Sequence, residues 1–218
     1  MLRAEELHHS FGSVKALDGI SFAVRPGQTL AIFGPNGAGK TTLLKVLAGL
    51  IRPRRGNAHV EGGRRAIGWI GHQAQLYNQL TVNENIRFWA SLYGVTPPGE
   101  LLARLGLEEH ADRPVRALSR GLLQRVAIAR ALVHNPAVLL LDEPFTGLDR
   151  TAAETLGRLL AQHGAGGRAT VLVTHNVEEG TGLATDVAFM RAGRFVHFAP
   201  RAGRGPQQVG EEYRNAIA

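Results

Sequence analysis

Two short segments of this chain carry residues whose types and spacing could handle a phosphate and a metal ion. The first, Gly34-Pro35-Asn36-Gly37-Ala38-Gly39-Lys40-Thr41, fits the pattern G-x-x-x-x-G-K-T. Glycines let successive backbone N–H groups turn toward one anion, and a helix starting at the loop adds its positive end. Lys40 supplies a charge for the β- and γ-phosphates, and the hydroxyl of Thr41 can bind Mg²⁺. We therefore predict a Mg-ATP site here, with Thr42 beside it.

The second segment, Leu139-Leu140-Leu141-Asp142-Glu143, places two carboxylates at the end of an apolar run. The carboxyl ends of strands are where α/β sheets bind ligands. Asp142 can hold Mg²⁺ through water, and Glu143 can polarise an attacking water molecule. Taken alone, the pair also fits two solvated turn residues before Pro144. The phosphate loop favours the catalytic interpretation.

Both segments follow apolar runs that are typical of buried strands. The run 29–33 is bounded by glycines and leads through the loop into a helix predicted over 41–50. Similar runs predict strands over 67–70, 137–141 and 170–174. Continuous apolar strands that alternate with helices indicate a mostly parallel sheet covered on both faces. We therefore predict an α/β fold.

The length of 218 residues suits one large domain, 1–218, with an insert. The pattern turns helical from about 83 to 133, with Asn83 as the expected N-cap of a helix over 84–93 and further helices over 101–107 and 121–133. This stretch is predicted to be an inserted helical subdomain. Short strands are expected over 2–7, 19–24 and 58–60, with a terminal pair over 186–190 and 194–198. We expect part of the tail, 200–218, to be disordered.

Composition narrows the class of protein. The chain has no cysteine, which excludes disulfides and thiolate metal sites, and it contains no apolar run of about 18 residues that could span a bilayer. The N-terminus has no apolar signal core, so we expect a cytoplasmic protein. The net charge is +7, but the arginines are scattered and the densest group is Arg52-Pro53-Arg54-Arg55, so no nucleic-acid partner is expected.

A third segment, Leu118-Ser119-Arg120-Gly121-Leu122-Leu123-Gln124-Arg125, resembles the signature sequence of ABC-type ATPases, which usually reads Leu-Ser-Gly-Gly-Gln. Ser119 and Gly121 at a helix start could present N–H donors to a phosphate, although a Ser-capped surface helix has the same pattern. Arg120 replaces the usual glycine and Leu122 the usual glutamine. The loss of that glycine could reduce the approach of the backbone to the γ-phosphate. Alternatively, Arg120 could add a positive charge there or lie across the interface with a second subunit.

Further marks of that family follow in order. Gln73 lies where the Q-loop glutamine is found, Thr146-Gly147-Leu148-Asp149 resembles the D-loop, and His175 follows a predicted strand as the switch histidine does. Phe11 matches the aromatic residue that stacks on adenine. Taken singly, Phe11 also fits a core residue, Gln73 a surface amide and His175 a hydrogen-bonded loop histidine. Together they make the chain similar to ABC-type ATPases from about residue 2 to residue 198.

The resemblance implies a P-loop NTPase core, an N-terminal antiparallel β subdomain and an inserted α-helical subdomain. It implies that the chain is an ATP hydrolase. A second copy or a homologous ATPase subunit would pack head to tail, so that Ser119, Gly121 and Asp149 of one copy meet the ATP held by Lys40 of the other. Glu143 would be the general base, His175 would contact the γ-phosphate, and Gln73, with Thr41 and Asp142, would sense Mg²⁺.

The resemblance also implies transmembrane permease subunits and a location on the cytoplasmic face of the membrane. In the family a groove near the Q-loop receives a membrane-partner helix, and the stretch 72–93 offers aromatic residues for it: Tyr77, Phe88, Trp89 and Tyr93. The runs Gly71-His72-Gln73 and Leu80-Thr81-Val82-Asn83-Glu84-Asn85 look like the haem-exporter ATPases of cytochrome c maturation, but multidrug and antibiotic exporters share these cues.

Two other functions compete with a transport motor. Soluble ABC-type ATPases that act on ribosomes or DNA usually carry two cassettes or a long coiled-coil insert, and this chain shows neither. A regulator that binds nucleotide without turnover is the third possibility. Intact Glu143 and His175 argue against it.

Overall fold

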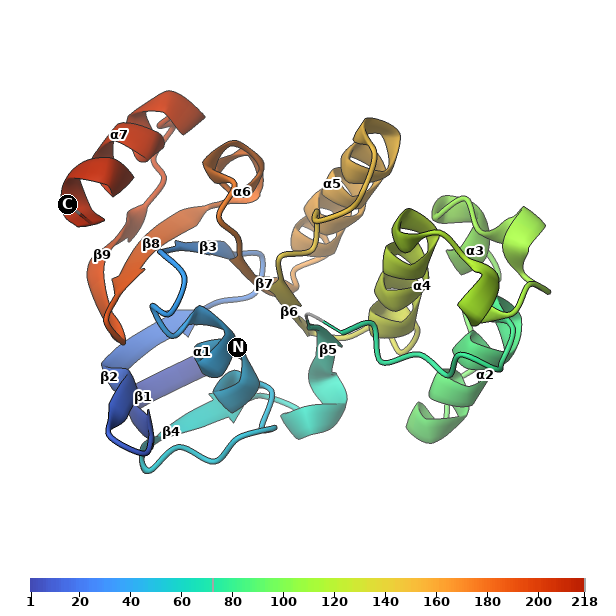
Figure 1. Ribbon diagram of the computed structural model, residues 1–218, viewed down its shortest axis with the longest axis horizontal. Coiled ribbons are helices and arrows are strands. Elements are labelled where there is room, and N and C mark those ends of the chain that lie inside the picture. Colours follow the sequence, from blue (N-terminus) through green and yellow to red (C-terminus); the bar gives the residue numbers. More distant parts are fainter. Residues whose placement is uncertain (72, 218) are drawn as a thin grey trace.

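The computed structural model describes residues 1–71 and 73–217, and it contains two sheets (Figure 1). The smaller sheet is antiparallel, with the order β2-β1-β4: β1 is Leu2–Phe11, β2 is Val14–Val24 and β4 is Arg55–Val60. The larger has the order β5-β6-β7-β3-β8-β9 and is parallel except for β9. Its strands are β3 Thr29–Phe33, β5 Ile67–Ile70, β6 Val138–Asp142, β7 Ala169–Val173, β8 Asp186–Arg191 and β9 Arg194–Pro200. The predicted α/β fold is confirmed.

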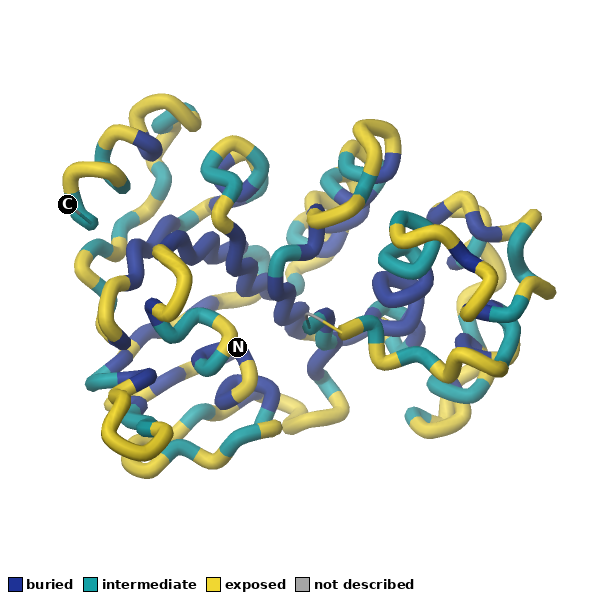
Figure 2. The backbone as a smooth tube through the Cα atoms, viewed as in Figure 1, coloured by how far each residue is buried: buried dark blue, intermediate teal, exposed yellow. Residues whose placement is uncertain are grey.

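Helices cover both faces of the larger sheet, which explains its continuous apolar strands. Every residue of β3, β6 and β7 is buried, and Figure 2 shows them as a dark core through the middle of the molecule. On one side α1 (Lys40–Leu47) packs between the two sheets through Leu43, Leu44 and Leu47. On the other side lie α5 (Arg150–Ala165), α6 (Val177–Leu183) and α7 (Pro206–Ile217).

The inserted helices lie beside β5, at the edge of the larger sheet (Figure 1): α2 (Val82–Tyr93), α3 (Leu101–Arg104) and α4 (Arg120–Leu132). Three short 3₁₀ turns, over 63–66, 108–110 and 115–117, complete the list of helical elements among the described residues. The buried side chain of Asn85 ties α2 to the preceding loop, because its amide donates to Tyr77 O and Thr81 O at 3.1 and 2.9 Å and its carbonyl accepts from Tyr77 N.

Several local predictions need correction. Thr81, not Asn83, caps α2: its hydroxyl accepts from Glu84 N at 3.1 Å, and Glu84 Oε2 accepts from Thr81 N at 2.8 Å. This capping box satisfies two free N–H groups, whereas Asn83 lies inside the helix. The helix expected over 101–107 ends at Arg104. We predicted no helix over 150–165 or 177–183, where α5 and α6 lie.

The tail is ordered into regular elements. Residue 200 ends β9, and residues 206–217 form α7, where we expected partial disorder. Val209 is fully buried, and the ring of Tyr213 lies 5.5 Å from that of Phe189 and 6.3 Å from that of Phe33. Apolar contacts with β3 and β8 therefore hold a segment whose composition alone indicated a loop.

One buried histidine makes stability depend on pH. His163 on α5 is 4% exposed, and burial lowers its pKa from 6.5 to about 4. Between these values the unfolded chain binds the proton and the folded chain does not. Stability should therefore fall as the pH falls from 6.5 to 4, by on the order of 3 kcal/mol from this group.

We expect His163→Gln to flatten the pH dependence of unfolding between pH 6.5 and 4, as measured by chemical denaturation at several pH values. The exposed His59→Gln is the matched control and should leave the slope unchanged. An unaltered slope in His163→Gln would contradict the assignment.

Candidate functional site

The loop 34–41 joins β3 to α1 and depends on glycines at two points. Gly39, the N-cap of α1, has φ +103°, and a Cβ there would lie 2.1 Å from Ala16 O. A Cβ on Gly34 would lie 2.4 Å from Met190 O. The β8–β9 turn supports the loop from outside, because Gly193 N donates to Ala38 O at 3.0 Å. Neighbouring backbone therefore fixes the shape of the loop.

Lys40 closes the loop with its own side chain. Its Nζ donates to Gly34 O at 2.6 Å and to Pro35 O at 3.1 Å. Burial lowers the pKa of Lys40, and the nearby Glu143 and Asp142 counteract that effect. A phosphate would offer this ammonium group a stronger, charged acceptor than two neutral carbonyls.

The two carboxylates lie at the end of β6, as predicted. Asp142 is buried, and Glu143 follows it with φ +51°, a conformation that costs about 1 kcal/mol or more in a residue with a side chain. Three contacts hold Glu143: its N–H donates to Val173 O at 2.9 Å, Thr174 Oγ1 donates to its Oε2 at 3.1 Å, and His175 Nδ1 lies 2.9 Å from the same oxygen. His175 is otherwise exposed, so Glu143 orients it.

The metal ligands fit Mg²⁺ bound to a nucleotide. No cluster of three or more His, Asp or Glu side chains occurs in 1–71 or 73–217 that could hold a metal ion by itself. Mg²⁺ in nucleotide sites takes one or two protein oxygens, and phosphate oxygens and water complete its octahedron. The hydroxyl of Thr41, exposed in the first turn of α1, and the carboxylate of Asp142 supply such oxygens.

The signature segment lies against the loop that follows the carboxylates in the same chain. Ser119 caps α4, and the side chain of Arg120 lies on Gly147, where a Cβ would be 3.0 Å from its Nε. Gln124 Nε2 donates to Pro144 O at 2.9 Å, and Arg125 pairs with Asp149 at 3.2 Å. A cavity of about 180 Å³ lies between them, bordered by Arg120, Gln124, Asp142 and Glu143 among others.

The predicted site residues thus fall into two groups. Lys40, Asp142, Glu143 and His175 converge. Ser119 and Gly121 belong to the start of α4, which lies apart from α1 (Figure 1), and Asp149 caps α5 by accepting from Ala152 N at 2.8 Å. Phe11 ends β1, is 54% exposed and meets His9 edge-on at 4.8 Å. Gln73 is exposed after β5, and its neighbour His72 lies outside the described residues.

Three residues that support the site were not predicted: Thr174 beside Glu143, and Met190 and Gly193 beside the loop. Thr174 stands directly before the predicted His175, so a search of that strand end for hydroxyls could have found it. No local signal marks Met190 or Gly193, because their contact with the loop arises from the parallel pairing of β3 with β8.

Comparisons with known proteins agree with this geometry. A family model described as "ABC transporter" matches residues 17–146. The chain is 42% identical to "Cobalt import ATP-binding protein CbiO" of Rhodobacter capsulatus, covering 90% of this chain and 77% of that protein. It is 40% identical to "Cytochrome c biogenesis ATP-binding export protein CcmA 2" of Salmonella paratyphi A, covering 80% and 89%.

Two solved structures are also similar. A dimeric, post-hydrolysis state of the ATP-binding cassette MJ0796 bound to ADP and Pi has a TM-score of 0.83 and 26% identity, covering 92% of this chain and 98% of that one. The cbiO1 protein of Clostridium perfringens, described as part of the transporter complex cbiONQ, has a TM-score of 0.78 and 28% identity, covering 98% and 92%. The chain belongs to the ABC transporter family. It is the ATP-binding domain of that family, an ATPase that uses Mg²⁺.

Some relatives are longer. The chain spans 66% of "Nod factor export ATP-binding protein I" of Ralstonia nicotianae, to which it is 36% identical over 90% of its own length. Across the described part of the chain, no helix is both long enough and apolar enough to cross a bilayer.

Two of the loop glycines, Gly37 and Gly39, make a matched pair. Both have positive φ, but a Cβ on Gly37 meets nothing within 4 Å, whereas one on Gly39 meets backbone. We expect Gly37→Ala to cost about 1 kcal/mol of stability, and Gly39→Ala to cost several kcal/mol and abolish binding of Mg-ATP. Thermal unfolding and nucleotide titration would check this. Equal stability of the two variants would contradict the close contact with Ala16.

Proposed function

We propose that this chain is the ATP-hydrolysing motor of a transporter whose membrane-spanning part consists of separate permease subunits. The observation that carries the proposal is the convergence of Lys40, Asp142, Glu143 and His175 at the ends of three adjacent parallel strands. A phosphate-binding loop next to a paired carboxylate and histidine has the parts needed to hold ATP and to activate water.

In this proposal each residue has a defined task. The loop amides and Lys40 bind the phosphates, and Phe11 stacks on the base. Thr41, Asp142 and Gln73 would hold Mg²⁺, which would supply positive charge beside the phosphate oxygens. Glu143 accepts the proton of the attacking water, and His175, oriented by that carboxylate, contacts the γ-phosphate.

We further propose that two copies, or this chain and a homologous ATPase, close head to tail around two ATP molecules. Ser119, Gly121 and Asp149 would then complete the site of the facing copy. The separation of α4, which Ser119 caps, from α1, which starts at Lys40, supports this arrangement (Figure 1), as does the dimeric form of the similar cassette MJ0796. A Cβ built on Gly121 would lie 3.3 Å from Gly147 O. The signature segment and the D-loop segment 146–149 therefore form one surface.

The cargo we propose is haem, exported for cytochrome c biogenesis. The similarity to CcmA 2 supports it, and the chain covers 89% of that protein. The higher identity to a cobalt importer favours import as the second candidate. Multidrug export is the third, because the proteins named for Nod factor export and for linearmycin resistance are also similar.

Co-purification would separate these functions. We expect a tagged copy, expressed with its neighbouring genes, to bring a permease subunit into detergent extracts and to localise to the inner face of the membrane. Ribosomes or nucleic acid in its place would indicate the soluble ABC-type ATPase instead.

We expect Glu143→Gln to lower ATP hydrolysis at least about 100-fold while Mg-ATP still binds, because only the general base is lost. Light scattering should show an ATP-dependent dimer of this variant. Lys40→Ala is the control that should lose ATP binding. Hydrolysis by Glu143→Gln at the wild-type rate would remove Glu143 from the proposed role.

A further inference from the structure

Thr174, the residue that follows β7, carries a buried hydroxyl group next to the proposed general base. The residue is 1% exposed. Its Oγ1 donates to Glu143 Oε2 at 3.1 Å and accepts from Asn176 N, at the N-cap of α6, at 3.0 Å. A backbone N–H can only donate, and a hydroxyl has a single proton. The contact with Asn176 therefore leaves the proton of Thr174 for the carboxylate.

The position of this hydroxyl is fixed from several sides. Thr174 N donates to Ile32 O at 3.3 Å, which ties the residue to β3, the strand that leads into the phosphate loop. A Cβ built on Gly180 of α6 would lie 2.9 Å from Thr174 Cγ2, so α6 packs directly on the methyl group. Branched side chains are also stiff about their first torsion. The side chain of Thr174 consequently has little room to rotate.

Thr174 and His175 meet the same oxygen of Glu143. His175 Nδ1 lies 2.9 Å from Oε2, the atom that accepts from Thr174. Both contacts use Oε2, which leaves Oε1 to meet the attacking water. The imidazole of His175 is 74% exposed, whereas the hydroxyl of Thr174 is buried. Thr174 is therefore the contact that stays in place when His175 turns toward a phosphate.

We propose that Thr174 is a positioning residue for ATP hydrolysis, and that its hydroxyl holds Glu143 Oε2 so that Oε1 faces the attacking water. The inference rests on the proposed function, which makes Glu143 the general base, and adds the group that sets its orientation. The water oxygen bonds to the γ-phosphorus, and the bond from that phosphorus to the β–γ bridging oxygen breaks. The water proton passes to Oε1 and then to the released phosphate, while Thr174 keeps its own proton.

The chain offers a matched pair of threonines for the test. Thr170 on β7 is fully buried, and among the described residues its Oγ1 has no hydrogen-bond partner. Thr174→Val and Thr170→Val thus remove the same group and keep the branched shape. We expect Thr174→Val to lower kcat about tenfold or more with an unchanged KM for Mg-ATP, because only the orientation of the base is lost. Thr170→Val should keep the wild-type kcat, and Thr174→Ser, which retains the hydroxyl, should recover most of it.

A double variant separates positioning from folding. Glu143→Gln removes the carboxylate that Thr174 holds, so adding Thr174→Val to it should lower the residual rate by less than about twofold. Loss of the contact with Asn176 N would instead destabilise the chain equally with Glu143 or its replacement present. Thermal unfolding measures that effect, and the rates are compared at a temperature where every variant is folded. Should Thr174→Val fail to fold, Thr174→Ala against Thr174→Ser gives the same comparison.

A wild-type kcat in Thr174→Val, or no recovery in Thr174→Ser, overturns the proposal. So does an equal fall of kcat in both single valine variants, or a loss in the double variant as large as the two single losses combined. Each of these results leaves the proposed function standing as long as Glu143→Gln is itself inactive. A wild-type rate in Glu143→Gln refutes the assignment of the base and this inference with it.

Discussion

The parallel pairing of β6, β7 and β3 is the constraint on which the site depends. Asp142 pairs with Val173 on one side of β7, and Ile32 pairs with Val173 on the other. Adjacent strands lie about 4.8 Å apart, so this register brings the residues that follow them to one edge. Glu143 consequently meets Thr174 and His175, and the Lys40 loop starts beside them. A shift of one residue would turn each of these side chains to the opposite face.

The same edge contains conformations that are unfavourable in isolation. Glu143 has a positive φ, and Lys40 is half-buried. Gly34 and Gly39 lie so close to backbone carbonyl oxygens of other segments that a Cβ would not fit. Such features persist only where the surrounding structure determines them fully. Here the surroundings are three strands with every residue buried, together with α1 and the β8–β9 turn.

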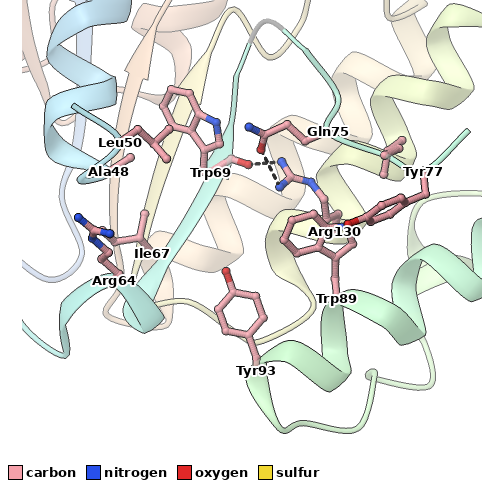
Figure 3. Close-up of a pocket in the computed structure, with 11 residues that line it drawn as sticks. Ala48, Leu50, Arg64, Ile67, Trp69, Gln75, Tyr77, Trp89, Tyr93 and Arg130 are labelled. Atoms are coloured by element: carbon pink, nitrogen blue, oxygen red, sulfur yellow. Dashed lines mark hydrogen bonds between the residues drawn. The ribbon is translucent and has the colours of Figure 1, made fainter.

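Helix α4 contacts two parts of the surface: the loop after the carboxylates, and a groove lined by Trp69, Trp89 and Arg130 (Figure 3). Near its start Gln124 donates to Pro144 O in the loop after the carboxylates, and near its end Arg130 donates to Trp69 O in the groove. Trp69 in turn pairs with Leu140 on β6, the strand that carries Asp142. Helix α4 and strand β5 therefore contact both the loop after the carboxylates and the groove.

Residue types and short-range spacing were enough to predict the local chemistry. The glycines and Lys40 of the loop, the carboxylates after an apolar strand and the helix capped by Ser119 follow from residue type and short-range spacing, because strand, turn and helix starts are set by nearby residues. Thr81 and Glu84 also have the spacing of a capping box, so the sequence indicated this N-cap as well, although we predicted Asn83.

Contacts between residues far apart in the chain could not be predicted in this way, because they depend on how the elements pack. The strand order, the contact of His175 with Glu143 and the support of the loop by Met190 and Gly193 join residues far apart in the chain. Arg130 reaches Trp69 and Trp89 across the inserted subdomain, and Tyr213 reaches Phe33 from the far end of the chain. Periodicity shows which face of an element is apolar, but the partner of that face is set by how all the elements pack together.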